Sequence, residues 1–369
     1  MAKLVVENVT KKYGPALTLE KISFTAEEGQ ITVLLSPPNG GKTGICKIVA
    51  GLDEVDSGKV YLGDRDITDL EPKERRVSMM FQKLALYPNM NVFENIASPL
   101  KALHLPPSEV INQVEAIANK MKISHTLYRK PGTLSGGERQ RVALSRALVK
   151  NNADLYILDE PLTNLDAKIR ASMRAEFKIL QKEINQTMLY ATPDPIEALA
   201  LADKLIVLDK GKIIQQGTPE YIYRNPINKF VATFVGYYPI NLIEGSIIEK
   251  GEKIILQTNL FEIEISKLRD SVKDHINSKV TLGLRPELLN VVKKEPKVQE
   301  SLDLFYIKGE VFEFEIRGSD TVVYVKINDQ IIRVLESKIT KYDIGIKVWL
   351  QFNLKDIYLF DAESGLLIR

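Results

Sequence analysis

Ile31-Thr-Val-Leu-Leu-Ser-Pro-Pro-Asn-Gly-Gly-Lys-Thr43 is the stretch of sequence that decides the fold. Residues 31–35 are apolar except for Thr32, a β-branched residue, and such a run is typical of a strand buried in a parallel sheet. A glycine-containing loop follows, and Lys42-Thr43 opens a helical stretch over residues 44–50. In this arrangement the backbone N–H groups and the helix N-terminus bind phosphates, the lysine reaches the β and γ oxygens, and the hydroxyl binds Mg²⁺. Lys42 and Thr43 are therefore candidates for those roles.

The loop itself is irregular. Ser36 stands where the usual pattern has its first glycine, and Pro38 removes an N–H group that could face a phosphate. Asn39 is the non-glycine residue that best tolerates a positive φ, so the turn can survive this change. Taken alone, Gly-Gly-Lys-Thr after a strand is open to a second interpretation as an ordinary turn. The candidate phosphate-binding residues are Ser36, Asn39, Gly40, Gly41, Lys42, Thr43 and Gly44.

A second element is Leu158-Asp-Glu160, which ends another buried apolar strand. The carboxyl ends of parallel strands meet at one edge of a sheet, so we expect both carboxylates beside the phosphate loop. Asp159 suits coordination of Mg²⁺ through water, and Glu160 suits the role of general base on an attacking water. A lone Asp-Glu pair would more often be a solvated strand end.

A third element is Leu134-Ser-Gly-Gly-Glu-Arg-Gln140, which precedes a helix expected over residues 139–150. Ser135 and the two glycines after it would form an anion-binding cap at the helix N-terminus. In isolation this motif could equally be an ordinary helix cap. The combination of all three elements at these spacings is highly specific for a nucleotide site.

The rest of the chain predicts two kinds of architecture. Residues 3–14 and 17–24 read as an antiparallel strand pair, and residues 88–150 are rich in helix, with one helix starting at Pro107. Further apolar strands at residues 189–192 and 205–208 predict an α/β sheet with a helical insertion. After residue 236, short strands of alternating apolar and acidic residues predict a separate all-β barrel or sandwich of about 130 residues.

Composition excludes several classes of protein. The 369 residues are 44% hydrophobic and 27% charged, as in a packed globular protein and unlike a disordered or collagen-like chain. Fifty basic and 48 acidic residues give a net charge of +2, too little to attract nucleic acid by charge alone. Apolar runs fall far short of the ~18 residues of a membrane span, and Glu7 interrupts any signal peptide. The single cysteine, Cys46, fits a reducing cytoplasm.

Taken together, these motifs resemble those of the ATP-binding cassette (ABC) transporter ATPases, specifically the maltose and glycerol-3-phosphate type that energises bacterial and archaeal carbohydrate importers. The resemblance implies an α/β ABC ATPase domain at residues 1–236 with a helical subdomain at about 88–150, followed by an all-β, OB-type (TOBE-like) regulatory domain at residues 237–369. It covers nearly the whole chain. The stretches that carry it, besides those above, are Val77-Ser-Met-Met-Phe-Gln82, Leu86-Tyr-Pro88, Glu94-Asn-Ile-Ala97, Pro161-Leu-Thr-Asn-Leu-Asp-Ala-Lys168, Phe230-Val-Ala-Thr-Phe-Val-Gly236, Gly283-Leu-Arg-Pro-Glu287 and Leu359-Phe-Asp-Ala-Glu-Ser-Gly365.

The resemblance also assigns roles to residues. It implies ATP and Mg²⁺ as ligands, stacking of adenine on Tyr13, and catalysis by Glu160, Asp159 and Gln82. The Mg²⁺ contacts would be Thr43, Gln82 and Asp159, and residues 84–89 would touch a helix of a membrane subunit. A second set would act across a dimer interface on the site of the opposite subunit: Ser135, Gly136, Gly137, Glu138 and Asp166.

The chain departs from the family at its own site. Members carry Thr-His-Asp-Gln where this chain has Thr192-Pro-Asp-Pro195, so Pro193 stands in place of the switch histidine that contacts the γ-phosphate. Proline has no side-chain donor, and the loss of one preorganised donor costs about 3–4 kcal/mol of transition-state stabilisation, or about 10²–10³ in rate. The phosphate loop departs from the family pattern as well, at Ser36, Pro38, Asn39 and Gly44.

These departures all affect residues of the chain's own nucleotide site. The motifs that would act in the site of a partner subunit are intact. We therefore predict a degenerate ATPase in a heterodimer whose partner carries sound motifs. Two transmembrane permease subunits and, indirectly, an extracytoplasmic solute-binding protein would complete the importer, with this chain peripheral at the cytoplasmic face of the membrane. There are three alternatives. The chain could be an active homodimeric sugar-import ATPase that tolerates the changes in its motifs, a non-hydrolysing regulatory or structural subunit, or a soluble non-transport ABC protein.

Overall fold

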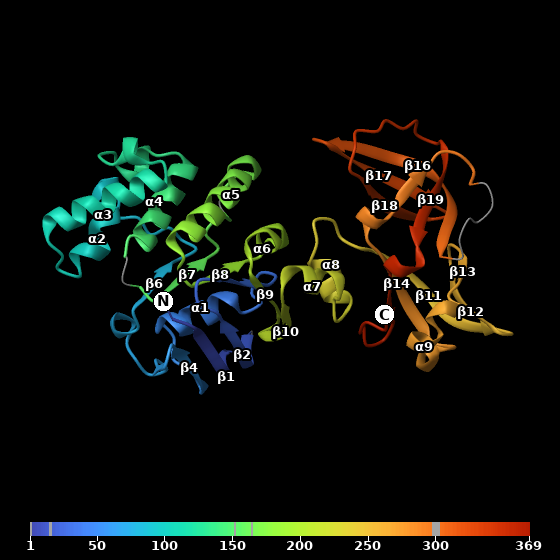
Figure 1. Cartoon of the computed structure of the whole chain (residues 1–369), viewed down its shortest axis with the longest axis horizontal. Helices are drawn as coiled ribbons and strands as arrows, with labels where there is room; N and C mark the ends of the chain where they lie inside the picture. The colour runs from blue at the N-terminus through green and yellow to red at the C-terminus, as the bar shows by residue number, and fades with distance from the viewer. Residues whose placement is uncertain (1, 15–16, 151–152, 164, 297–302) are drawn as a thin grey trace. The chain divides into compact units, whose positions relative to one another are not determined.

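The computed structural model describes residues 2–14, 17–150, 153–163, 165–296 and 303–369. The chain divides into two compact units, Met1–Ile222 and Tyr223–Arg369 (Figure 1). No helix in the described ranges is both long enough and apolar enough to cross a membrane.

A six-stranded sheet forms the centre of the first unit, in the order β10-β9-β3-β8-β7-β6. Strands β9, β3, β8, β7 and β6 are parallel, and β10 joins β9 in antiparallel fashion. Every residue of β3, β7 and β8 is buried, which confirms the buried parallel strands predicted from their apolar runs. The strands are β3 (Ile31–Leu35), β6 (Val77–Met80), β7 (Leu155–Asp159), β8 (Met188–Thr192), β9 (Lys204–Asp209) and β10 (Lys212–Gly217).

A second, antiparallel sheet in this unit has the order β2-β1-β4-β5. It contains the predicted opening strand pair, β1 (Leu4–Tyr13) and β2 (Leu17–Ala26), together with β4 (Ser57–Leu62) and β5 (Arg65–Asp66). Helix α1 (Lys42–Ala50) shares one hydrophobic core with strands of both sheets. The helix that starts at the phosphate loop is therefore anchored by apolar burial along its length.

Three helices, α2 (Val92–Lys101), α3 (Pro107–Lys120) and α4 (Gly136–Leu148), make up the predicted helical insertion and lie grouped near β6 (Figure 1). Helix α3 starts at Pro107 as predicted. Helix α4 begins at Gly136 rather than at Arg139, because Ser135 caps it and draws both glycines into its first turn. Helices α5 (Ala167–Ile184) and α6 (Pro195–Leu201) connect β7 to β8 and β8 to β9.

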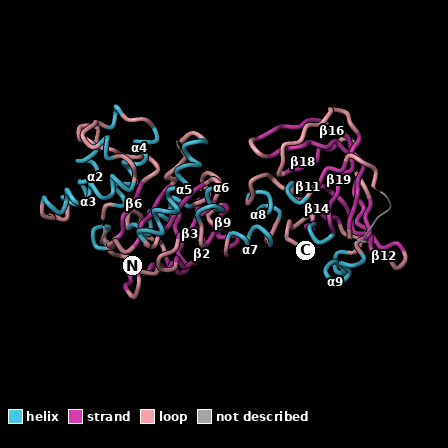
Figure 2. Tube along the Cα trace, turned by 45° about the horizontal axis from the view of Figure 1, so that its top comes forward, coloured by secondary structure: helices cyan, strands magenta, loops and turns pink. Residues whose placement is uncertain are grey.

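The second unit is built around two five-stranded antiparallel sheets, which confirms the predicted all-β architecture (Figure 2). Their orders are β13-β12-β11-β14-β20 and β15-β19-β16-β17-β18, and both sheets contribute to one core. The division at Ile222 places α8 in this unit, whereas the domain boundary predicted at residue 236 remains a prediction. The elements from α7 onward are α7 (Pro219–Arg224), α8 (Lys229–Phe234), β11 (Asn241–Lys250), β12 (Lys253–Thr258), β13 (Glu262–Glu264), α9 (Arg269–Val272), β14 (Lys279–Leu284), β15 (Asn290–Val292), β16 (Leu304–Arg317), β17 (Asp320–Ile327), β18 (Gln330–Glu336), β19 (Lys347–Asn353) and β20 (Ile357–Asp361).

Candidate nucleotide site

The loop between β3 and α1 keeps a tight phosphate-loop turn despite its irregular sequence. Asn39 has a φ of 62° and Gly41 has a φ of 109°, so the asparagine does take the left-handed conformation expected of it. A Cβ atom on Gly40 would lie 2.6 Å from Cβ of Ser36, so the serine side chain fits only because residue 40 is a glycine. The Ser36 hydroxyl donates a hydrogen bond to the Pro37 carbonyl at 2.9 Å. Ser36 is thus accommodated inside the turn.

The structure brings this loop to the carboxyl end of β7, as the sheet-edge argument predicts. The Thr43 hydroxyl donates to Oδ1 of Asp159 at 3.1 Å. Nζ of Lys42 lies 3.0 Å from Oε1 of Glu160, and only 3% of Lys42 and 7% of Glu160 are exposed. A lysine and a carboxylate of this kind, buried together, can exchange their ion pair for contacts with a charged ligand.

Glu160 is held from several sides. Its φ of 50° is unusual for a residue with a side chain and marks a sharp turn after the strand. Nε2 of Gln82, which follows β6, donates to Oε2 of Glu160 at 2.9 Å, and the Thr163 hydroxyl donates to the same oxygen at 3.2 Å. These contacts fix the orientation of the carboxylate at the sheet edge.

Burial sets the electrostatic environment of Asp159. Burial raises the pKa of this carboxyl to about 6, with the hydrogen bond from Thr43 acting in the opposite direction. The Thr43 hydroxyl and the Asp159 carboxylate are hard oxygen donors of the kind that Mg²⁺ prefers. Within the described part of the chain, no group of three His, Cys, Asp or Glu side chains could hold a metal ion by itself. This donor pair fits an ion that takes its remaining ligands from water and phosphate.

Tyr13, at the end of β1, packs against the start of α1. Its hydroxyl donates to Oδ2 of Asp53 at 2.8 Å. A Cβ atom on Gly44 would lie 3.0 Å from Cε2 of the ring and 3.1 Å from the hydroxyl oxygen. The tyrosine ring occupies the space that a side chain at position 44 would need, which explains why this position is a glycine.

Pro193 lies at the same edge of the sheet, between the last residue of β8 and the first turn of α6. The backbone N–H of Ser36 donates to the Thr192 carbonyl at 3.4 Å, which places the turn beside the start of the phosphate loop. Asp194 caps α6 by accepting from the Ile196 N–H at 2.8 Å. These contacts hold the backbone on both sides of Pro193. The proline itself offers no side-chain hydrogen bond.

The motif at residues 134–140 caps α4. The Ser135 hydroxyl accepts from the Glu138 N–H at 3.2 Å, and Oε2 of Glu138 accepts from the Ser135 N–H at 2.7 Å, which makes a complete capping box. Gly137 is close to α5, since a Cβ atom on it would lie 3.3 Å from Ile169. Asp166 in turn caps α5 by accepting from the Ile169 N–H at 3.0 Å.

Two groups of predicted residues are therefore distinguished by their position. The loop, Gln82, Asp159, Glu160 and Pro193 lie at the carboxyl edge of the central sheet, and Tyr13 lies beside Gly44 at the start of α1. Ser135 to Glu138 and Asp166 lie at the N-termini of α4 and α5. Among the described residues, no hydrogen bond or ion pair joins residues 134–140 to residues 36–44. The sequence alone did not single out Asp53, Thr163 or Arg170: the partner of Asp53 is 40 residues away, Arg170 binds a backbone carbonyl, and the short-range contact of Thr163 with Glu160 has no sequence pattern that marks it.

The fold and the site define the class of phosphate-binding-loop ATPases. Residues 19–163 match the ABC transporter family, and residues 282–360 match the TOBE domain. The chain is 37% identical to the sn-glycerol-3-phosphate import ATP-binding protein UgpC of Psychromonas ingrahamii, over 99% of this chain and 95% of that protein. It is 34% identical to the trehalose/maltose import ATP-binding protein MalK of Thermococcus litoralis, over 99% of both chains.

Among solved structures, the dimeric ATP-binding cassette MJ0796 in a post-hydrolysis state with ADP and Pi matches with a TM-score of 0.53 and 27% identity. The match covers 58% of this chain and 98% of that one. The chain therefore belongs to the ABC transporter ATP-binding proteins, and it is a transport ATPase subunit with a C-terminal TOBE domain.

Proposed function

We propose that this chain is the ATP-binding subunit of an importer for sugars, polyols or glycerol-type solutes. Relatives whose names specify import of sn-glycerol-3-phosphate and of trehalose or maltose align with 99% of the chain, including its β domain. In this role the chain is peripheral at the cytoplasmic face of the membrane. Two transmembrane permease subunits receive the motion of the ATPases, and an extracytoplasmic solute-binding protein delivers the solute.

The contacts at the sheet edge support a binding mode for ATP with Mg²⁺. Lys42 would exchange Glu160 for the β and γ oxygens of the nucleotide, and this exchange would leave Glu160 as the general base toward water. Thr43 and Asp159, with Gln82 nearby, would hold Mg²⁺, which neutralises charge on the β and γ oxygens when bound. Tyr13, anchored by Asp53, would stack on the adenine.

We further propose that the chain is the degenerate half of a heterodimeric ATPase. The observation that carries this proposal is the contrast between the two groups of residues. The group for the partner's site has a complete capping box at Ser135 and Glu138, whereas the group for the chain's own site has Pro193 where a donor is needed. The chain's own site would bind ATP and hydrolyse it slowly, while Ser135, Gly136, Gly137 and Asp166 complete the active site of the partner.

The first experiment is to purify the chain from its native membrane and to identify every protein that accompanies it. A second ATPase with an intact glycine-rich loop and a switch histidine is the expected result. Recovery of this chain as the sole ATPase, together with two permease subunits, would mean a homodimer and would contradict the heterodimer.

Solute uptake by the assembled importer then tests the division of labour. We expect uptake to survive Lys42→Ala, which removes the lysine of the degenerate site, and to fail with Ser135→Arg, which blocks the cap lent to the partner. Because Lys42 is paired with buried Glu160, recovery of the complete complex with each variant is the control for folding. Loss of uptake with both variants would favour two equivalent sites.

A second candidate function, an active homodimeric ATPase, is favoured by one specific observation. Glu160 retains its contacts with Lys42, Gln82 and Thr163, although a site that never hydrolyses ATP has no evident use for an oriented general base. The composition of the purified complex decides between the two.

A further inference from the structure

Arg170 lies in the first turn of α5 and contacts the loop that precedes this helix. Its Nη2 donates to the Leu165 carbonyl at 2.9 Å and to the Thr163 carbonyl at 3.4 Å. Glu160 lies before these two residues in the chain, and Asp166, which caps α5, lies after them. Two backbone carbonyls between the general-base candidate and the partner-facing aspartate are therefore bound by one guanidinium.

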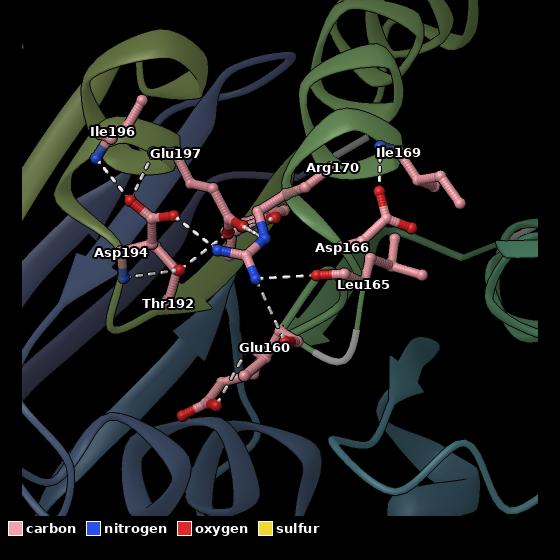
Figure 3. Close-up of polar contacts among 11 residues, drawn as sticks. Glu160, Leu165, Asp166, Ile169, Arg170, Thr192, Asp194, Ile196 and Glu197 are labelled. Carbon is pink, nitrogen blue, oxygen red and sulfur yellow. Dashed lines mark hydrogen bonds and ion pairs between the residues drawn. The ribbon is translucent and has the colours of Figure 1, made fainter. Parts of the chain in front are cut away.

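The other side of the same guanidinium faces the turn that contains Pro193. Nη1 of Arg170 lies 3.2 Å from Oδ2 of Asp194, and Nε lies 3.9 Å from Oε1 of Glu197, too far for a hydrogen bond. The Glu197 side chain is only 1% exposed and also accepts from the Thr192 hydroxyl at 2.8 Å. Figure 3 shows the guanidinium between the Leu165 carbonyl and Asp194.

We propose that Arg170 is a positioning residue for ATP hydrolysis, which holds the backbone at Thr163 and at Leu165 against the turn at Pro193. The inference rests on the roles that the proposed function gives to Glu160 and Asp166. Arg170 acts on Glu160 through Thr163, whose carbonyl it binds and whose hydroxyl donates to Oε2 of Glu160 at 3.2 Å. It acts on Asp166 through the adjacent Leu165 carbonyl.

The arrangement uses the planar shape of arginine as well as its charge. Nη1 and Nη2 point to different elements, the α6 cap and the loop before α5, and a rigid fork can satisfy both at once. The ammonium group of a lysine is a single point of charge and would hold one side only. Arg170→Lys keeps the positive charge but removes the planar fork. It therefore distinguishes a positioning role, which needs the fork, from a general contribution of the charge to stability.

The test is steady-state ATP turnover with Mg²⁺ by the assembled complex, measured for Arg170→Gln, Arg170→Lys and Asp194→Asn. Because the proposed function assigns most turnover of the complex to the partner's site, which Asp166 completes, we expect displacement of Asp166 in Arg170→Gln to lower kcat roughly 10- to 100-fold, with KM for ATP unchanged. Arg170→Lys should retain the melting temperature of the unaltered complex but not its kcat. Asp194→Asn keeps a good helix cap and should lower kcat by an amount that does not add to that of Arg170→Gln.

Arg174→Gln is the matched control, since it removes an equal charge one turn further along α5, and its kcat should stay unchanged. Recovery of kcat by Arg170→Lys would overturn the inference, and so would unchanged turnover in Arg170→Gln or an equal loss in Arg174→Gln. These results would leave the proposed function intact. A complex that hydrolyses no ATP with the unaltered chain would overturn the proposed function and this inference with it.

Discussion

A single methyl group added at Gly44 would lie 3.0 Å from Cε2 of Tyr13 and 3.1 Å from its hydroxyl oxygen. Overpacking of this kind costs about 1–3 kcal/mol, while replacing a helical glycine by alanine recovers up to about 1 kcal/mol. We therefore expect Gly44→Ala to lower the free energy of unfolding by about 1 kcal/mol, measured by urea denaturation.

The same substitution in a Tyr13→Ala background is the control. Without the ring, the helix propensity of alanine should dominate, so Gly44→Ala should stabilise that background by up to about 1 kcal/mol. Equal destabilisation in both backgrounds would show that the tyrosine ring is not the reason for the glycine.

Pro193→His tests whether the missing donor limits hydrolysis at the chain's own site. The turnover of that site should rise, by up to about 10²–10³ if the imidazole donor is the sole defect. The measurement uses a complex in which the site of the other ATPase is inactivated. Pro193→Ala is the matched control, because it introduces the same backbone N–H without the imidazole. Little change with histidine, or an equal rise with alanine, would show that the donor is not the limiting defect.

At the scale of the element, the N-terminus of α4 should respond to acid through Glu138. Hydrogen bonds from the Ser135 N–H and hydroxyl lower the pKa of Glu138 from its usual value of 4.5. A carboxyl whose pKa is lower in the folded state than in the unfolded state stabilises the folded protein at any pH above the unfolded-state pKa. This stabilisation is lost as the pH falls through the folded-state pKa. Glu138→Gln keeps the capping geometry but not the charge, so it should be about 0.5 kcal/mol less stable than the unaltered chain at neutral pH.

Urea denaturation at several pH values checks this prediction. The difference in unfolding free energy between the unaltered chain and Glu138→Gln should shrink progressively below pH 4.5 as the carboxyl becomes protonated. A difference that is constant with pH would mean that the charge does not contribute to the cap.

The elements that could be predicted from sequence are those with a local signal. Apolar runs predicted the strands of the central sheet, and the sheet-edge rule placed Asp159 and Glu160 beside Lys42. The contacts of Tyr13 with Asp53 and of Arg170 with Asp194 span 40 and 24 residues without any pattern that pairs them. Such contacts depend on how the helices pack onto the sheets, so only the structure reveals them.

For the whole molecule, each of the two units has a hydrophobic core of its own. In the second unit, Arg285 follows β14 and is only 1% exposed. It donates to the Tyr223 carbonyl at 2.6 Å and to the Val235 carbonyl at 3.3 Å, and its guanidinium carbon lies 3.7 Å from the centre of the Tyr223 ring. One side chain thus binds the segment at the start of this unit to its β core.

Arg285→Met should therefore destabilise the second unit alone, by about 3 kcal/mol, because it removes charged hydrogen bonds and a desolvated cation–π contact. Hydrogen–deuterium exchange resolved by segment checks this, with protection expected to fall across residues 223–369 and to stay unchanged in the strands around the phosphate loop. Arg269→Met is the control, because that arginine forms an exposed ion pair with Glu249 and its loss should cost at most about 1 kcal/mol. Equal effects of the two variants, or a loss of protection in both units, would show that Arg285 does not stabilise the second unit in this specific way.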